Sequence, residues 1–287
     1  MNYVLLALVA LLLTLQKITQ KRYNTICSSG AFLFSGMIAL CAMCVFLAVT
    51  AVRQAFIWDP ILWIPAVGFG VSYAVGTVFV VLAIRNGSLA KTTLVTSYSL
   101  LVPAFSGLLI LNESVRITML AGILLLSLSL WLTHHRKEAE KKATVAWVVC
   151  VGLGFLGNGL CSTVQKLAPH YADIAREGQS VYMILAFGLA ALLLITASFL
   201  TKEREPGITL RRGAPLALLC GLCNGGVNLF VLFLNGRIPA SVMFPTISAG
   251  QIILVCLYAR LICRERYTKK QWAGFAVGIL SVILLNL

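Results

Sequence analysis

The chain has 287 residues, of which 60% are hydrophobic and only 11% are charged, and its mean hydropathy is +0.94. A soluble domain has roughly a quarter charged residues and at most about half apolar ones, so this composition excludes a water-soluble enzyme and a disordered or collagen-like chain. The net charge of +14 would suggest a nucleic-acid partner in a soluble protein, but here the basic residues separate apolar runs. We therefore expect a lipid bilayer as the surroundings and no nucleic-acid partner.

The apolar runs predict helical spans. A membrane-crossing helix needs about 20 apolar residues, and runs that are continuously apolar favour helices over the alternating strands of a membrane barrel. The sequence predicts ten spans, which in chain order cover 3–16, 28–52, 60–84, 92–111, 117–133, 143–165, 181–200, 214–234, 238–259 and 271–287. The expected fold class is all-α, a polytopic membrane protein with ten transmembrane helices.

The loop charges predict an orientation, because Lys and Arg are retained on the cytoplasmic side. When the loops between the predicted spans are assigned alternately to two sides, 18 of the 23 basic residues fall on one side. The other side holds only Arg53, Arg116, Lys166, Arg176 and Arg237. The bias predicts that both termini lie outside. We expect a multi-pass protein of the plasma (inner) membrane.

No pattern predicts a cofactor or a reaction. Cys41 with Cys44, and Cys220 with Cys223, have C-x-x-C spacing, but both pairs lie in apolar runs without a nearby His. Packing of small apolar residues is the favoured interpretation, with a zinc or redox site as the alternative. There is no Walker motif for ATP and no Ser, His or Cys constellation for catalysis. We expect no metal, no cofactor and no enzymatic activity.

An internal repeat is the most specific signal in the sequence. At a spacing of 149 residues, Thr14–Lys17 recurs as Thr163–Lys166, Gly76 as Gly225, and Asn86–Gly87 as Asn235–Gly236. At a spacing of 152, Glu113 recurs as Glu265, and Ala121–Gly122 as Ala273–Gly274. Each repeat holds five predicted spans, an odd number, so the second copy enters the membrane in the opposite sense. Two inverted five-helix repeats are typical of secondary transporters that work by alternating access around a midplane site.

Several motifs resemble the EamA domain of the drug/metabolite transporter superfamily. They are Gly87–Ala90, Leu101–Phe105 and Asn112–Ser114 in the first repeat, and Pro239–Ser241, Arg264–Arg266 and Gly274 in the second. The resemblance implies two EamA-like repeats, 1–137 and 138–287. It also implies a central cavity lined by the first, third, fourth, sixth, eighth and ninth spans, with the fifth and tenth peripheral. Family members are usually drawn with both termini cytoplasmic, whereas the charge count here predicts termini outside.

Polar residues inside spans are the candidates for a substrate pathway, because they are costly in lipid and tend to face a water-filled path. The alternative for the Ser and Thr members is interhelical hydrogen bonding. The candidates are Gln16, Lys17, Tyr73, Thr77, Thr96, Tyr98, Asn158, Ser162, Gln165, Asn224, Asn228, Thr246, Ser248 and Gln251.

Three further residues are candidate hinges or kinks. Pro103 and Pro245 lie inside predicted spans, and Gly225 forms a G-x-x-x-G with Gly221, for which close helix packing is the favoured alternative.

Lys17 and Lys166 are predicted to end the first and sixth spans. The favoured interpretation is two snorkelling lysines, and the alternative is a pair of pathway-mouth residues that attract an anionic solute.

The predicted function is secondary transport, by alternating access, of a small metabolite such as an amino acid or a related neutral or weakly anionic solute, with export as the direction. None of the nine acidic residues falls in the middle of a predicted span, which disfavours carboxylate-based proton coupling. The alternatives are a multidrug efflux transporter and a non-transporting membrane scaffold. The expected partners are a small-molecule substrate and the bilayer, with the protein a monomer or a weak homodimer.

Overall fold

The computed structural model describes residues 2–27, 30–54, 56, 58–87, 89–99, 101–110, 117–134, 144–171, 176–203, 206–262 and 268–285. Glu113 and Glu265, which the sequence places near helix junctions, lie outside these residues, as does the predicted boundary between 137 and 138.

All regular secondary structure in these ranges is helical. The elements are α1 (Asn2–Ile26), α2 (Ala31–Arg53), η1 (Pro60–Leu62), α3 (Trp63–Asn86), α4 (Leu89–Tyr98), α5 (Leu101–Ile110), α6 (Ile117–His134), α7 (Val145–Tyr171), α8 (Arg176–Leu200), α9 (Pro206–Ile208), the π-helix η2 (Thr209–Gly213), α10 (Ala214–Leu234), α11 (Ala240–Leu261) and α12 (Lys269–Leu285). Six segments of the described chain are long and apolar enough to cross a membrane: 2–26, 31–53, 60–86, 145–168, 178–200 and 206–234. The predicted all-α, polytopic membrane protein is confirmed.

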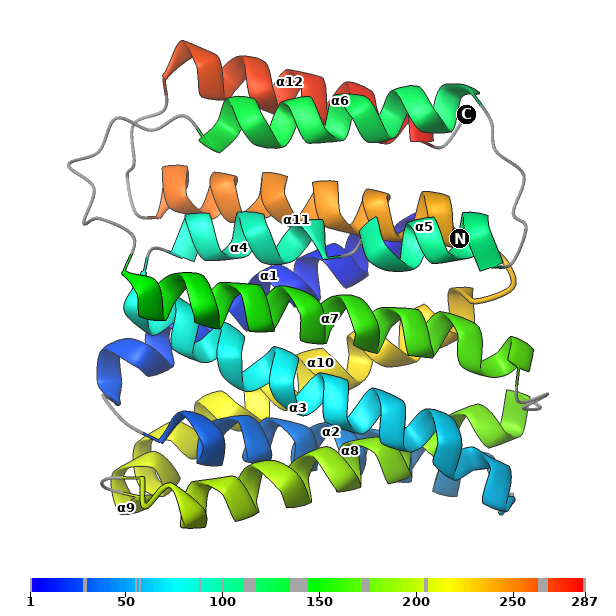
Figure 1. The fold of residues 1–287 in the computed structure, drawn as a ribbon, viewed down its shortest axis with the longest axis vertical. Helices are drawn as coiled ribbons and strands as arrows, with labels where there is room; N and C mark the ends of the chain where they lie inside the picture. The colour runs from blue at the N-terminus through cyan, green and yellow to red at the C-terminus, as the bar shows by residue number, and fades with distance from the viewer. Residues whose placement is uncertain are drawn as a thin grey trace.

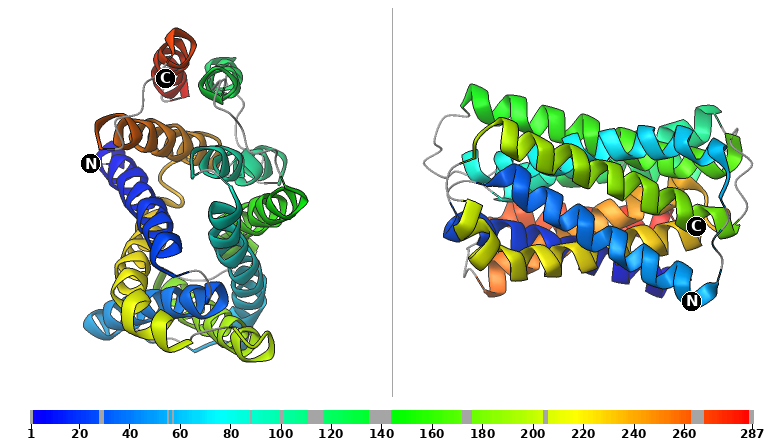
Figure 2. Two further views of the ribbon diagram at one scale, coloured as in Figure 1. Left: turned by 90° about the vertical axis from the view of Figure 1, so that its left-hand side faces the viewer. Right: turned by 90° about the horizontal axis from the view of Figure 1, so that it is seen from below.

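The long helices lie side by side, and both chain termini lie at the same end of the bundle (Figure 1). Figure 2 shows α6 and α12 as a pair set apart from the other helices, in the view along the helix axes. At the opposite edge α2 packs against α8, and between these edges α3 packs on α7 and α1 on α10. The arrangement leaves the inner faces of α1, α3, α7 and α10 turned toward a common centre.

The largest apolar core joins α2, α3 and α8. Phe187 packs edge-on against Phe69 and Tyr73, with ring centroids 5.4 Å and 5.0 Å away, and Phe46 stacks on Phe187 at 5.8 Å. Aromatic pairs with this geometry add about 0.5–1.5 kcal/mol each beyond their buried area. This core holds the ring of Tyr73 beside the central space described below.

Glycines let several helices approach closely. A Cβ added to Gly157 on α7 would lie 2.3 Å from the backbone nitrogen of Gly76 on α3. On α10, a Cβ at Gly221 or Gly225 would meet Cys41 at 2.3 Å or Val45 at 2.8 Å on α2. Gly225 lies inside the unbroken helix α10, and its contact with α2 is that of a packing glycine.

The first helix is longer than predicted. The predicted end of the first span, at residue 16, is wrong, because α1 continues to Ile26. Contacts at its far end explain the extension: the Tyr23 hydroxyl donates to the Gly30 carbonyl oxygen at 2.9 Å, and Asn24 Nδ2 donates to the Val81 carbonyl oxygen at 2.9 Å. Lys17 therefore lies within the helix and not at its end.

The predicted span 92–111 is two helices, since α4 ends at Tyr98 and α5 begins at Leu101. Pro103 explains the break, because its ring has no N–H and clashes with the carbonyl four residues earlier, that of Ser99. The Ser99 oxygen instead accepts from the Val102 N–H at 3.1 Å. Pro245, by contrast, lies inside α11, which is assigned as one helix.

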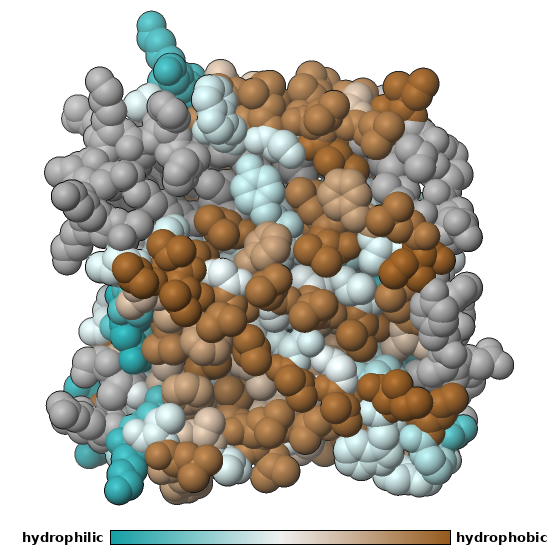
Figure 3. Space-filling view, in the orientation of Figure 1, coloured by the Kyte–Doolittle hydropathy of each residue, from teal (hydrophilic) through white to brown (hydrophobic). Residues whose placement is uncertain are grey.

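The described surface suits a bilayer. Large apolar side chains such as Val4, Leu109 and Ile117 are more than two-thirds exposed, at 71%, 80% and 86%. Figure 3 shows hydrophobic residues spread over the middle of this face and hydrophilic ones gathered mainly along its left edge. Soluble monomers rarely expose continuous apolar patches of this extent, so lipid is the natural neighbour of the helix sides.

Candidate functional site

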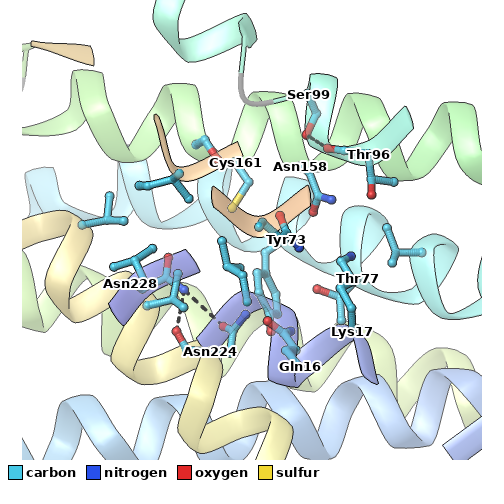
Figure 4. Close-up of a pocket in the computed structure, with 18 of the residues that line it drawn as sticks. Gln16, Lys17, Tyr73, Thr77, Thr96, Ser99, Asn158, Cys161, Asn224 and Asn228 are labelled. Atoms are coloured by element: carbon cyan, nitrogen blue, oxygen red, sulfur yellow. Dashed lines mark hydrogen bonds between the residues drawn. The ribbon is translucent and has the colours of Figure 1, made fainter. Parts of the chain in front are cut away.

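A polar cavity lies at the centre of the bundle, with about 840 Å³ of empty space that includes some open solvent (Figure 4). Its lining comes from α1, α3, α4, α7, α10 and α11, together with Ser99 after α4. The lining residues are Val9, Leu13, Gln16, Lys17, Gln20, Tyr73, Thr77, Val80, Thr96, Ser99, Asn158, Cys161, Ser162, Gln165, Asn224, Val227, Asn228, Val231, Phe244, Ile247 and Gln251.

Helix α1 contributes one continuous face. Positions 9, 13, 16, 17 and 20 follow the helical spacing that puts side chains on one side, and all five line the cavity. The face is apolar at Val9 and Leu13 and polar at Gln16, Lys17 and Gln20. Gln20 is 1% exposed, and its Oε1 has no hydrogen-bond partner. The α1 face therefore lines one side of the cavity, with polar residues at the end nearer Gln20.

Lys17 is the charged residue of the cavity. It is 8% exposed, and the lining holds no Asp or Glu. In the described part of the chain no carboxylate forms an ion pair with it, and the nearby ionisable group is the Cys220 thiol. A snorkelling lysine keeps its ammonium at the membrane surface. The burial of Lys17 in the cavity does not agree with that interpretation.

Helices α7 and α10 face α1 with amide side chains. Asn228 Nδ2 donates to the Asn224 carbonyl oxygen at 2.9 Å and to its Oδ1 at 3.2 Å (Figure 4). Gln165 Nε2 donates to the Asn228 carbonyl oxygen at 3.2 Å, and Asn235 Nδ2 donates to the Gln165 carbonyl oxygen at 3.0 Å. This network joins α7 to α10 and orients the amides of Gln165 and Asn228, which both line the cavity.

The α3 and α4 side supplies hydroxyl groups. Thr96 Oγ1 donates to the Thr92 carbonyl oxygen at 2.9 Å within α4. Ser99 lines the cavity where the helix is broken, and its hydroxyl donates to the Thr96 carbonyl oxygen. Irregular backbone at membrane depth is tolerated where it lines a cavity, so the break between α4 and α5 fits its position.

Three of the predicted pathway residues lie elsewhere. The Tyr98 hydroxyl donates to the Ser127 carbonyl oxygen on α6 at 3.4 Å, and Ser248 Oγ donates to the Ser97 carbonyl oxygen on α4 at 2.9 Å. Thr246 is half-buried on α11 and is not in the lining. Ser248 thus makes the interhelical hydrogen bond that was the alternative interpretation for the Ser and Thr members, and Tyr98 makes an interhelical hydrogen bond as well. Lys166 is 8% exposed and also lies outside the lining.

The cavity lining also includes polar residues outside the predicted pathway set, namely Gln20, Ser99 and Cys161. Gln20 follows Gln16 by one helical turn, so it would have been found if the first helix had been extended past its cluster of basic residues. In the described ranges no three His, Cys, Asp or Glu side chains gather as metal ligands, and the thiols of Cys41, Cys44, Cys220 and Cys223 are free.

Comparison with known proteins agrees with this architecture. A curated relative from Serratia proteamaculans (strain 568), named as the probable 4-amino-4-deoxy-L-arabinose-phosphoundecaprenol flippase subunit ArnE, is 35% identical over 88 residues, which are 31% of this chain and 72% of the relative. A solved structure titled "Crystal structure of protein" has a similar fold, with a TM-score of 0.72 at 15% identity over 98% of this chain and 94% of that one.

The sequence profile of the EamA-like transporter family matches residues 147–287. Together with the relative, which is aligned over most of its own length, and with the full-length similarity of fold, this match agrees with the helical bundle and its central cavity. The chain belongs to the EamA-like transporter family, a family of membrane transporters and not of enzymes.

Proposed function

We propose that this protein is a secondary transporter that exports a small metabolite, such as an amino acid or a related neutral or weakly anionic solute, across the plasma membrane by alternating access. The observation that carries the proposal is the central polar cavity, which is lined by helices from both halves of the chain. Polar groups are expensive in a membrane interior, so their convergence on one cavity supports a pathway rather than a scaffold.

Two inverted repeats, 1–137 and 138–287, form part of this proposal. If α1, α2, α3, α4–α5 and α6 correspond to α7, α8, α10, α11 and α12, the contacts of one half have counterparts in the other. The pair α3–α7 corresponds to α10–α1, the pair α3–α8 to α10–α2, and the pair α1–α11 to α7–α5, and all of these pairs are in contact. This reciprocity supports an exchange of conformations between the halves as the means of alternating access.

Transport by purified protein in liposomes tests the proposal. Exchange of radiolabelled amino acids and related metabolites is measured first with the wild-type chain. Asn158→Leu, which replaces a cavity amide with an apolar group of similar size, is expected to lower exchange by about tenfold, the equivalent of one lost hydrogen bond. Ser248→Ala is the matched control, since Ser248 is buried in an interhelical hydrogen bond outside the cavity.

The alternatives predict other results. Exchange of chemically unrelated aromatic compounds, and not of metabolites, would indicate multidrug efflux. A wild-type protein that exchanges no solute would indicate a scaffold. An equal loss of exchange activity in Asn158→Leu and Ser248→Ala would indicate that the cavity is not part of the transport pathway.

A second candidate function rests on the curated relative, whose name describes a flippase subunit for a lipid-linked sugar. For this chain the corresponding activity would be the movement of an amphipathic lipid-linked solute, with its polar headgroup in the cavity and its tail in the bilayer. Movement of a fluorescent lipid-linked sugar between leaflets, without exchange of water-soluble metabolites, would favour this candidate over the first.

A further inference from the structure

We propose that the cavity binds the oxyanion of its substrate, a carboxylate or a phosphate, and that Lys17 is the residue that recognises it. The inference rests on the proposed transport function and narrows the class of substrate. It concerns the binding step alone, so it is tested separately from movement across the membrane.

The position of Lys17 is the first argument. Its side chain lines the cavity from the middle of α1, with nine-tenths of the residue buried. Figure 4 shows Lys17 and Thr77 on one side of the cavity view and the Asn224–Asn228 pair on the other. An ionisable residue at this depth tends to face a water-filled path and to have a charged or polar partner.

The missing countercharge is the second argument. A buried cation is stable only when water, a hydrogen-bond acceptor or an anion compensates its charge. The cavity lining contributes no carboxylate, and within the described ranges none pairs with Lys17. An anionic group of a bound solute would supply the compensation that the protein does not.

The neighbours of Lys17 provide the third argument. Oxyanions are bound by N–H and O–H donors, and charge-assisted hydrogen bonds are about twice as strong as neutral ones. Gln16 and Gln20 line the cavity on the same face of α1, one on each side of Lys17 along the helix. The Nε2 group of each amide carries two N–H donors, the type of group from which an oxyanion accepts hydrogen bonds.

The repeat supplies a natural comparison. Lys166 is the residue that corresponds to Lys17 at the spacing of 149, and both lysines are 8% exposed. Lys166 lies outside the cavity lining. Two lysines of equal burial and equivalent sequence context therefore differ in whether they face the cavity, which makes Lys166→Gln a matched control for Lys17→Gln.

The experiment measures thermal stabilisation of the purified full-length chain in detergent, because a ligand that binds the native state raises its melting temperature. Each anionic probe is paired with a neutral analogue: lactate with lactamide, and glycerol 3-phosphate with glycerol. Mixed micelles that contain phosphatidylglycerol, paired with micelles that contain the phosphate-free diacylglycerol, test a lipid-borne phosphate. The pairs separate a free carboxylate, a free phosphate and a lipid headgroup as the source of the oxyanion.

The wild-type chain and Lys166→Gln should be stabilised by at least one anionic probe more than by its analogue. Lys17→Arg should retain this preference, whereas Lys17→Gln should lose about ten- to hundredfold in apparent affinity for the anionic probe. Lys17→Met provides a second neutral variant if Lys17→Gln does not fold.

The proposal is overturned if no anionic probe is preferred by the wild-type chain, or if Lys17→Gln and Lys17→Met keep the preference. A failure of the proposed transport function would give a different experimental result. The wild-type chain would then bind the anionic probe through Lys17 and yet exchange no solute in liposomes.

Discussion

Ser129 on α6 donates a hydrogen bond to the carbonyl oxygen of Gly274 on α12, at 2.6 Å. Ser281 on α12 donates in turn to the carbonyl oxygen of Gly122 on α6, at 2.7 Å. Ser281 follows Ser129, and Gly274 follows Gly122, by the repeat spacing of 152 residues. The two bonds are therefore counterparts under exchange of the repeats, and they support a two-fold relation between α6 and α12.

This pair of bonds predicts equal effects of two mutations. Ser129→Ala and Ser281→Ala should each lower the free energy of unfolding by about 1 kcal/mol, the usual contribution of one hydrogen bond. Denaturation of the purified chain measures the change. Neither variant should alter substrate affinity, because α6 and α12 do not line the cavity. A large effect in one variant and none in the other would contradict the equivalence.

Close packing of α3 on α7 predicts a position-dependent effect of alanine. Gly157→Ala would place a methyl group 2.3 Å from the backbone nitrogen of Gly76, and relief of such overpacking typically costs about 1–3 kcal/mol. Gly152→Ala in the same helix meets no atom within 4 Å, so it should be neutral or slightly stabilising. Melting temperatures of the two variants test this contrast, and equal values would contradict it.

A carboxylate that caps α2 predicts a stability effect away from the cavity. Glu203 accepts from the backbone N–H groups of Phe32 and Leu33, at 2.9 Å and 3.0 Å, and from the Ser198 hydroxyl at 2.8 Å. Glu203→Ala should cost about 1–2 kcal/mol, as for other lost helix caps. Glu203→Gln keeps an acceptor and should cost less. Thermal denaturation distinguishes them, and an unchanged melting temperature in Glu203→Ala would argue against the cap.

The hydrogen bond of Ser248 predicts a variant with a purely structural defect. Ser248→Ala leaves the Ser97 carbonyl oxygen without this partner and should cost about 1 kcal/mol of stability. The Kd of a cavity ligand should stay the same, since Ser248 does not line the cavity. Equilibrium binding to the folded variant measures this Kd, and weaker binding would indicate that Ser248 belongs to the substrate pathway.

The loop charges predict the orientation of the chain in the cell. Because basic residues are retained in the cytoplasm, a reporter fused after Leu287 should lie outside, and one inserted after Lys202 should lie inside. Both termini lie at one end of the bundle (Figure 1), so an N-terminal reporter should agree with the C-terminal one. A cytoplasmic signal from the terminal fusions would show that the orientation is the reverse of the predicted one.

The class of the protein and most of its helices could be predicted from the sequence. Continuous apolar runs have few alternatives in a bilayer, because only a helix satisfies its own backbone there. The costly amides Asn158, Asn224 and Asn228 were predicted as pathway residues, and all three line the cavity. The repeat spacing also predicted which helices would correspond, without any knowledge of how they pack.

The ends of the helices and the directions of their side chains depend on how the helices pack, so the sequence did not predict them. The basic residues after Lys17 predicted a loop, whereas α1 continues to Ile26, and both Lys17 and Gln20 line the cavity. Tyr23 and Asn24 hold the far end of this helix by hydrogen bonds to other segments. Ser248 and Asn228 are both polar residues inside apolar helices, yet Ser248 bonds a neighbouring helix and Asn228 lines the cavity. The reason is physical: lipid and protein interior are alike apolar, so a hydrophobic helix carries no sequence pattern that separates its outer face from its inner one.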